Sequence, residues 1–248
     1  MENSKTLTAG LKVVFNPKNI LRELVTMGWL DYLILAVLLG TQVVVYFISG
    51  TFDLMSNLTL LLSLFTIVNL ILVNRGRLTN YFWGTVGSAV WWVIALQSHL
   101  IGDIFSQSYY LIMQFVGIYF WKKNLDEFQG EKGEVAPRKI SLKIALLALL
   151  AFAVIYSLVL WTSHHLNGQQ IFLDATLLPL AIVGQLLMTY GYRVQWLVWF
   201  LIDTINVIIW YNNWQASGDS ALGMFVLQIL MLLNVFYGTY LWFRKEAE

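Results

Sequence analysis

Residues 196–210 read WLVWFLIDTINVIIW, a stretch that is apolar enough to cross a membrane yet contains an acid and an amide. If the stretch is helical, the residues at offsets 0, 3, 7, 10 and 14 fall on one face. They are Trp196, Trp199, Asp203, Asn206 and Trp210. A carboxylate and an amide are costly to bury in lipid, so this face is expected to line a cavity or contact a partner.

The composition is that of a membrane protein with several spans. Of 248 residues, 58% are hydrophobic and 12% are charged, and the mean hydropathy is +0.68. A water-soluble domain rarely reaches such values. The net charge of +1 offers no general attraction to nucleic acid, so none is expected as a partner. The chain has no cysteine, which excludes disulfides and thiolate ligands.

Eight segments are long and apolar enough to span a bilayer, which takes about 20 residues of helix. They cover residues 29–50, 56–74, 79–98, 103–121, 141–163, 170–190, 194–212 and 220–242. Because unpaired backbone groups cannot face lipid, we expect an all-α polytopic membrane protein with eight transmembrane helices. The charged connection 122–140 is expected to be a solvated linker. Residues 19–29, NILRELVTMGW, are expected to form an amphipathic helix on the membrane surface, or else the N-terminal residues 1–28 stay unstructured.

The basic residues predict the orientation of these helices. All 15 Lys and Arg residues fall within residues 1–28, 75–78, 122–143, 191–193 and 243–248. With eight spans, these segments all lie on the same side of the membrane. Basic residues concentrate in cytoplasmic connections, so both termini are expected in the cytoplasm.

Short matches between the two halves of the chain indicate a repeat. GIYFW at 117–121 corresponds to GTYLW at 238–242, an offset of 121 residues. At an offset of 116 residues, Trp83 corresponds to Trp199 and Asn69 to Gln185. Each match is weak in an aromatic-rich chain, but together they predict two related three-helix units.

The topology gives the repeat a meaning. Three-helix units at 56–121 and 170–242 have the same orientation only if one further span, 141–163, lies between them. This 1+3+1+3 arrangement is that of parallel repeats in transporters. It divides the chain into an N-terminal segment with an additional helix (1–55), a first repeat (56–121), a loop with a linker helix (122–169) and a second repeat with the C-terminal tail (170–248).

Polar and aromatic side chains within the spans are the candidate substrate-binding residues. Amides in membrane helices often only bond neighbouring helices, so each one is open between packing and ligand binding. Trp121 and Trp210 lie near the ends of spans and are expected in the aromatic belts of the membrane interfaces. The candidate substrate-binding residues are Trp196, Trp199, Asp203, Asn206, Gln107, Gln114, Tyr110, Asn234, Tyr237 and Asn69.

The chemistry of these residues favours binding over catalysis. No phosphate-binding glycine loop or hydrolase motif occurs in the sequence, so no catalytic residue, metal or cofactor is expected. Indole rings stack on flat ligands and attract cations, and a carboxylate also favours positive charge. Amides donate and accept, as hydroxyl and carboxamide groups require. The implied ligand is small, hydroxylated, and aromatic or cationic.

The WLVW motif at 196–199, followed by Asn206 and Trp210, together with the 3+1+3 arrangement, resembles the PnuC nicotinamide riboside transporters. These are bacterial relatives of the SWEET sugar transporters. The resemblance implies uptake of nicotinamide riboside across the bacterial inner membrane by facilitated diffusion, and a homotrimer surrounded by membrane lipids. The first-repeat counterpart of the motif, NYFW at 80–83, keeps only the second Trp. Ring binding is therefore expected mainly in the second repeat.

Other functions fit the same residues. Thiamine is also a cationic aromatic compound, so a thiamine or riboflavin transporter is an alternative, and so is a SWEET-like sugar carrier, although Asp203 disfavours the latter. A membrane protein that binds a ligand without moving it belongs to a different class. The connections between the spans are too short to contain a signalling domain, which disfavours this class.

Overall fold

The structure, a computed structural model, describes residues 2–50, 52–97, 101–128, 133–165 and 171–245. The chain is helical, as the apolar segments predict. The helices are α1 (Glu2–Val14), α2 (Pro17–Val25), α3 (Trp29–Ser49), α4 (Leu54–Arg75), α5 (Asn80–Gln97), α6 (Ile101–Phe128), α7 (Leu142–His165), α8 (Ile171–Thr189), α9 (Gln195–Ser217) and α10 (Leu222–Arg244). A short 3-10 turn, η2 (Gly218–Ala221), leads into α10.

Each of the eight segments expected to span the membrane overlaps one of the helices α3 to α10. Among the described residues, four helical segments are long and apolar enough to cross by length and composition alone: Trp29–Ser49, Leu54–Arg75, Leu142–Trp161 and Leu222–Arg244. Helix α6 is longer than expected and continues to Phe128. The protein is therefore an all-helical membrane protein with several spans.

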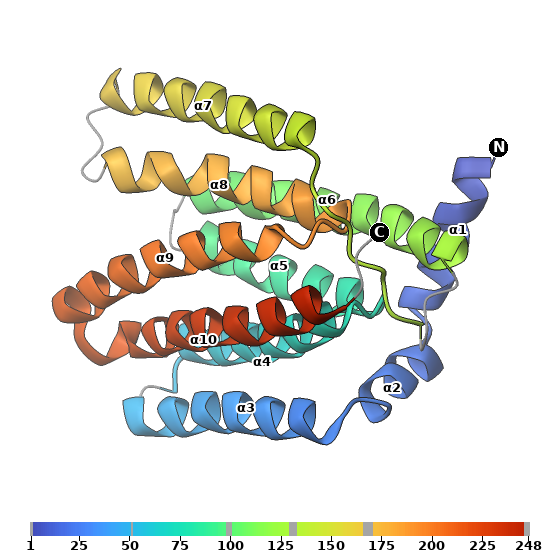
Figure 1. The fold of residues 1–248 in the computed structure, drawn as a ribbon. Coiled ribbons are helices and arrows are strands. Elements are labelled where there is room, and N and C mark those ends of the chain that lie inside the picture. Colours follow the sequence, from blue (N-terminus) through green and yellow to red (C-terminus); the bar gives the residue numbers. More distant parts are fainter. Residues whose placement is uncertain (1, 51, 98–100, 129–132, 166–170, 246–248) are drawn as a thin grey trace.

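Six helices surround the centre of the bundle. Helices α4, α5 and α6 pack in sequence, and so do α8, α9 and α10. The two groups then meet twice, because α4 packs against α10 and α6 packs against α8. Helix α3 covers α4 and α10, and α7 covers α8, so these two lie at opposite edges of the bundle (Figure 1).

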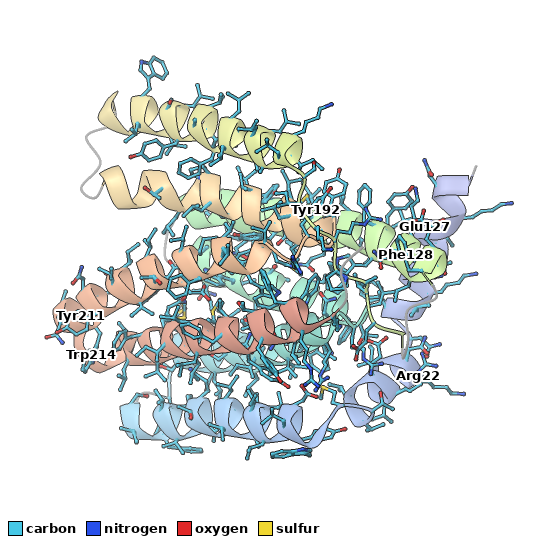
Figure 2. The ribbon with its side chains drawn as sticks, in the orientation of Figure 1. Arg22, Glu127, Phe128, Tyr192, Tyr211 and Trp214 are labelled. Atoms are coloured by element: carbon cyan, nitrogen blue, oxygen red, sulfur yellow. The ribbon has the colours of Figure 1, made fainter. Side chains whose placement is uncertain are left out.

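The ion pairs of the described residues gather at one end of the bundle. Helices α1 and α2 lie at this end, where α6 and α10 end (Figure 1), and α1 packs against α6. Figure 2 shows Arg22, Glu127 and Tyr192 at this end and Tyr211 and Trp214 at the other. We call the first of these the basic end.

An ion-pair network ties several elements together at the basic end. Arg75 of α4 pairs with the buried Asp31 of α3, with 2.5 Å between nitrogen and oxygen. Lys245 donates to the Arg75 carbonyl at 2.9 Å and pairs with Glu134 at 2.9 Å. Burial lowers the pKa of the Lys245 ammonium, although Glu134 opposes this shift.

Two tight turns at the basic end have the same geometry. The turn after α4 has Gly76 at φ +73°, and the turn after α8 has Gly191 at φ +76°. In each turn the residue after the glycine donates its N–H to a carbonyl five residues back, Arg77 to Leu72 and Tyr192 to Leu187, both at 2.9 Å. The left-handed backbone explains the glycine in each turn, because a Cβ is disfavoured there.

Residues 134–138, which we call the strap, connect these two turns. The Val135 N–H donates to the Gly76 carbonyl at 2.9 Å, and the Arg138 N–H donates to the Gly191 carbonyl at 2.8 Å. Val135 is only 1% exposed. The expectation of a solvated linker over 122–140 is therefore wrong for the strap, because its backbone and one side chain are built into the protein interior.

The N-terminal residues are more ordered than the sequence indicated. Helix α1 packs against α6, and Val14 at its end is fully buried. Glu23 of α2 accepts hydrogen bonds from the backbone N–H and the hydroxyl of Thr79, at 2.9 and 2.5 Å. Of the two expectations for residues 1–28, the unstructured one is wrong for the described part.

Candidate functional site

The six central helices line a cavity of about 190 Å³, which we call the central cavity. Every one of α4, α5, α6, α8, α9 and α10 contributes to its lining. Eight of the ten candidate binding residues lie there: Asn69, Gln107, Tyr110, Gln114, Trp196, Trp199, Asp203 and Asn206. Residues from three helices that are far apart in sequence, α4, α6 and α9, are thus brought to one place.

The row on α9 enters the central cavity because its residues share one helical face. Trp196, Trp199, Asp203 and Asn206 all line it, whereas Trp210 packs with the cluster formed by α3, α4 and α10. The two cavity tryptophans differ in burial. Trp196 is 2% exposed and belongs to the hydrophobic core, whereas Trp199 is only partly buried. The Trp199 ring is therefore the better placed of the two to stack on a ligand.

A glycine on α5 allows the amides to approach. A Cβ at residue 84 would lie 2.7 Å from the Gln114 Oε1 and 2.9 Å from the Asn69 Nδ2. Because Gly84 has no side chain, the amides of α4 and α6 reach the wall formed by α5. Asn69 also donates to the Asn80 carbonyl at 2.8 Å, which orients its side chain.

Several buried polar atoms that line the central cavity have no hydrogen-bond partner among the described residues. They are the Gln114 Oε1, the Gln185 Nε2, the Asp203 Oδ1, the Trp196 Nε1 and both amide atoms of Gln228. A buried polar atom without a partner costs about 1–3 kcal/mol. Such atoms are rare in folded proteins, and a group of them around one cavity is typical of a binding site for a polar ligand.

The electrostatics of the central cavity favour a cation. Asp203 is 3% exposed, and of the described residues that line the cavity it is the one acid, with no Lys or Arg beside it. Burial of an unpaired carboxylate is costly, so a positively charged ligand would complement it. No group of three His, Cys, Asp or Glu side chains in the described part of the chain could hold a metal ion.

The structure places two candidate residues, Asn234 and Tyr237, outside the lining of the central cavity. Asn74 and Asn234 exchange two side-chain hydrogen bonds, at 2.7 and 3.3 Å, and join α4 to α10. The Tyr237 hydroxyl donates to the Asp31 carboxylate at 2.7 Å and so joins α10 to α3. Both side chains therefore have partners within the protein.

The sequence pattern also missed part of the site. Thr66, Ser88 and Trp91 line the central cavity on α4 and α5, and Gln185 and Gln228 line it on α8 and α10. The small residues Gly84, Gly87 and Ser88, spaced by three and four positions, were the available signal on α5. Such spacing places them on one helical face, where small side chains leave space.

Trp121 was expected in an aromatic belt at the membrane interface, and this expectation is wrong. Its side chain is 1% exposed, and the Nε1–H donates to the Met188 carbonyl at 3.0 Å. Trp121 thus lies in the interior between α6 and α8. A position near the end of a span does not distinguish a belt residue from a buried one, because only the packing of neighbouring helices decides this.

Comparisons with known proteins show the family of the chain. The family model described as nicotinamide mononucleotide transporter matches residues 56–244, and the chain belongs to this family. The family consists of transporters rather than enzymes, and the protein is a multi-pass protein of the bacterial inner membrane. The resemblance to PnuC stated from residues 196–210 is confirmed.

The relatives and the solved structure with the following likenesses are named PnuC. The nicotinamide riboside transporter PnuC of Neisseria mucosa is 26% identical over 219 residues, which cover 87% of this chain and 82% of the relative. The PnuC of Haemophilus influenzae is 25% identical over 177 residues, covering 71% and 74%. A crystal structure of the vitamin B3 transporter PnuC superposes with a TM-score of 0.78 at 26% identity, covering 92% of this chain and 97% of that chain.

Proposed function

We propose that the protein takes up nicotinamide riboside across the inner membrane by facilitated diffusion. The observation that carries this proposal is the group of unpaired polar atoms and the buried carboxylate around the central cavity. The positive pyridinium ring of this ligand would stack on Trp199 and lie near Asp203. Its carboxamide and ribose hydroxyls would bond the unpaired amides of Gln114, Gln185 and Gln228.

The absence of cations from the described lining favours the nucleoside over the nucleotide. The family model is named for nicotinamide mononucleotide, whereas the relatives are named for nicotinamide riboside. A phosphate dianion in this cavity would lose its water and meet Asp203 without a Lys or Arg to pair with. We expect the mononucleotide to bind at least about 100-fold more weakly than the riboside, which calorimetry on the purified protein would measure. Comparable affinities would require an anion site elsewhere.

We also propose the architecture of eight spans with two parallel three-helix units, α4–α6 and α8–α10. The reciprocal packing of α4 on α10 and α6 on α8 supports it, as do the matching turns at Gly76 and Gly191. The turns correspond at an offset of 115 residues, one fewer than the offset that pairs Trp83 with Trp199. Rocking of the two units around the central cavity would expose it alternately to each side.

The orientation follows from the basic end. Its Lys and Arg residues favour the cytoplasmic side, which places both termini in the cytoplasm. The exposed leucines of α7, including Leu146 and Leu150, would face membrane lipids. A homotrimer is proposed from the family resemblance, and light scattering of the purified protein with its detergent accounted for would test it.

The decisive experiment has two parts. The first distinguishes the candidate substrates from one another, and the second distinguishes a carrier from a protein that only binds its ligand. Calorimetry with nicotinamide riboside, thiamine, riboflavin and glucose on the same sample ranks the ligands, and we expect nicotinamide riboside to bind most tightly. Uptake of labelled ligand into sealed proteoliposomes then tests transport. Tighter binding of thiamine would favour the related vitamin carrier. Binding without flux into vesicles would contradict transport altogether.

A further inference from the structure

Four aromatic side chains, Tyr81, Trp121, Trp196 and Trp242, form a continuous cluster that we call the aromatic plug. Tyr81 meets Trp121 with ring centroids 5.1 Å apart, and Trp242 lies 6.1 Å from both Trp121 and Trp196. All four are at most 2% exposed. Two of the rings come from α5 and α6, and the other two from α9 and α10, so the aromatic plug crosses the boundary between the proposed units.

The aromatic plug lies between the central cavity and the strap. Trp196 of the aromatic plug lines the central cavity, together with Val73, Met188 and Val235. These three aliphatic residues belong to the same core cluster as the four rings of the plug. Val135 of the strap belongs to this cluster too. The rings of the aromatic plug therefore lie on the side of the central cavity that faces the strap and the basic end.

Two hydrogen bonds hold the aromatic plug in place, one from each unit to the other. The Trp121 Nε1–H donates to the Met188 carbonyl at 3.0 Å, and the Trp242 Nε1–H donates to the Val73 carbonyl at 3.1 Å. Each acceptor also receives a backbone N–H at 2.9 Å from the glycine of the neighbouring turn. The two bonds are therefore additions to turns that are already closed, and they can break without unfolding either turn.

Glycines on the partner helices allow the remaining two rings to pack. A Cβ at Gly117 would overlap the Tyr81 ring, and a Cβ at Gly238 would overlap the Trp196 ring. The Tyr81 hydroxyl and the Trp196 Nε1 have no hydrogen-bond partner among the described residues. The hydroxyl of Thr189, which follows Met188 in sequence, has none there either. A core under no other constraint would avoid such atoms, because each loses its water without compensation. Their burial is explained if this region becomes wet in another conformation.

We infer that the aromatic plug is the gate between the central cavity and the cytoplasm, and that the two indole N–H bonds are its latch. The inference rests on the proposed function and its orientation. When the units rock apart at the basic end, both bonds between units break together and the unpaired polar atoms meet water. The gate would thus open as one event rather than ring by ring.

Cysteine accessibility tests the gate without any substrate, because the chain has no cysteine of its own. Thr189→Cys places a thiol beside the Met188 carbonyl, at a position that is 1% exposed. A membrane-impermeant maleimide is applied to inside-out vesicles, and the labelling rate is compared with and without Trp121→Phe or Trp242→Phe. Phenylalanine keeps a ring but removes the N–H donor. We expect each change to accelerate labelling about fivefold, the equivalent of one hydrogen bond of about 1 kcal/mol, and the double change to exceed either alone.

A second reporter distinguishes gate opening from general loosening. Ser63→Cys introduces a thiol at a fully buried position of α4 outside the core cluster of the aromatic plug. Its labelling should stay slow in both phenylalanine variants. Unchanged labelling at Thr189→Cys, a parallel rise at Ser63→Cys, or acceleration only in right-side-out vesicles would each overturn the gate. Because labelling needs no ligand, a failure here is distinct from a failure of nicotinamide riboside to bind.

Discussion

Ligand affinity should depend most on the side chain of Trp199. Its ring lines the central cavity and is only partly buried. A stacking contact contributes about 0.5–1.5 kcal/mol beyond burial, and a cation over the ring adds roughly as much. Trp199→Ala should therefore weaken nicotinamide riboside binding about 10-fold or more in calorimetry, and Trp199→Phe should lose less.

Trp161 provides the matched control for this change. It lies on α7, is 63% exposed and does not line the central cavity. Trp161→Ala should leave the dissociation constant unchanged. Parental affinity in a folded Trp199→Ala protein would remove this ring from the binding site.

Substitutions of two asparagines distinguish a residue that binds ligand from a residue that packs helices together. Asn206 lines the central cavity, whereas Asn234 is buried against Asn74. Asn206→Leu leaves a ligand group unpaired and should weaken binding by about 1–3 kcal/mol. Asn234→Leu should leave affinity nearly unchanged but lower the unfolding temperature, because Asn74 loses its partner. Calorimetry and thermal unfolding on both variants measure the two effects, and the reverse pattern would exchange the roles assigned to the two amides.

At the scale of elements, the packing of α9 against α10 depends on Gly238 of α10. The Trp196 ring occupies the space in which a Cβ of residue 238 would lie. Gly238→Ala should destabilise the protein by about 1–3 kcal/mol, because a fully buried ring cannot move away. Gly40→Ala is the matched control, since a Cβ there meets no atom of the described chain within 4 Å. Thermal unfolding in detergent should show a lowered midpoint for Gly238→Ala alone, and equal midpoints would mean that the ring repacks.

The elements also show where sequence patterns were informative. Apolar length predicted each of the helices α3 to α10, because a helix that satisfies its own backbone is a local property of the segment. The strap was missed for the opposite reason. Its sequence, EVAPR at 134–138, contains the charged residues Glu134 and Arg138 and the helix-breaking Pro137, as a solvated loop would. Its burial depends on two turns that lie more than 50 residues away from it on either side.

At the scale of the whole molecule, we expect transport without coupling to an ion. Asp203 is the one acid among the described residues of the central cavity, and the positive charge of the ligand would itself complement it. No further charged group is then needed in the transport cycle. Uptake into proteoliposomes should stop when the ligand concentrations on both sides are equal, whether or not a proton or sodium gradient is imposed. Accumulation above the external concentration that follows such a gradient would show coupling and contradict this expectation.

The sequence by itself determined the features that depend on local physics. Apolar length gave the helical class, and the spacing in 196–210 placed four side chains on the cavity face of α9. These signals are local because the helical period and the energy of burying backbone in lipid act within a single segment. The family resemblance rested on the same stretch.

Only the tertiary structure decided which of the polar and aromatic residues face the central cavity and which face another helix. Asn234 bonds to Asn74, 160 residues away in sequence, and the Trp121 indole bonds to a carbonyl 67 residues away. No local pattern distinguishes these residues from Asn206 or Trp199. An Asn or a Trp occupies the same kind of position in the helical pattern whether its side chain binds a ligand or a neighbouring helix. The difference arises when α4 meets α10 and α6 meets α8, and that packing is a property of the assembled bundle.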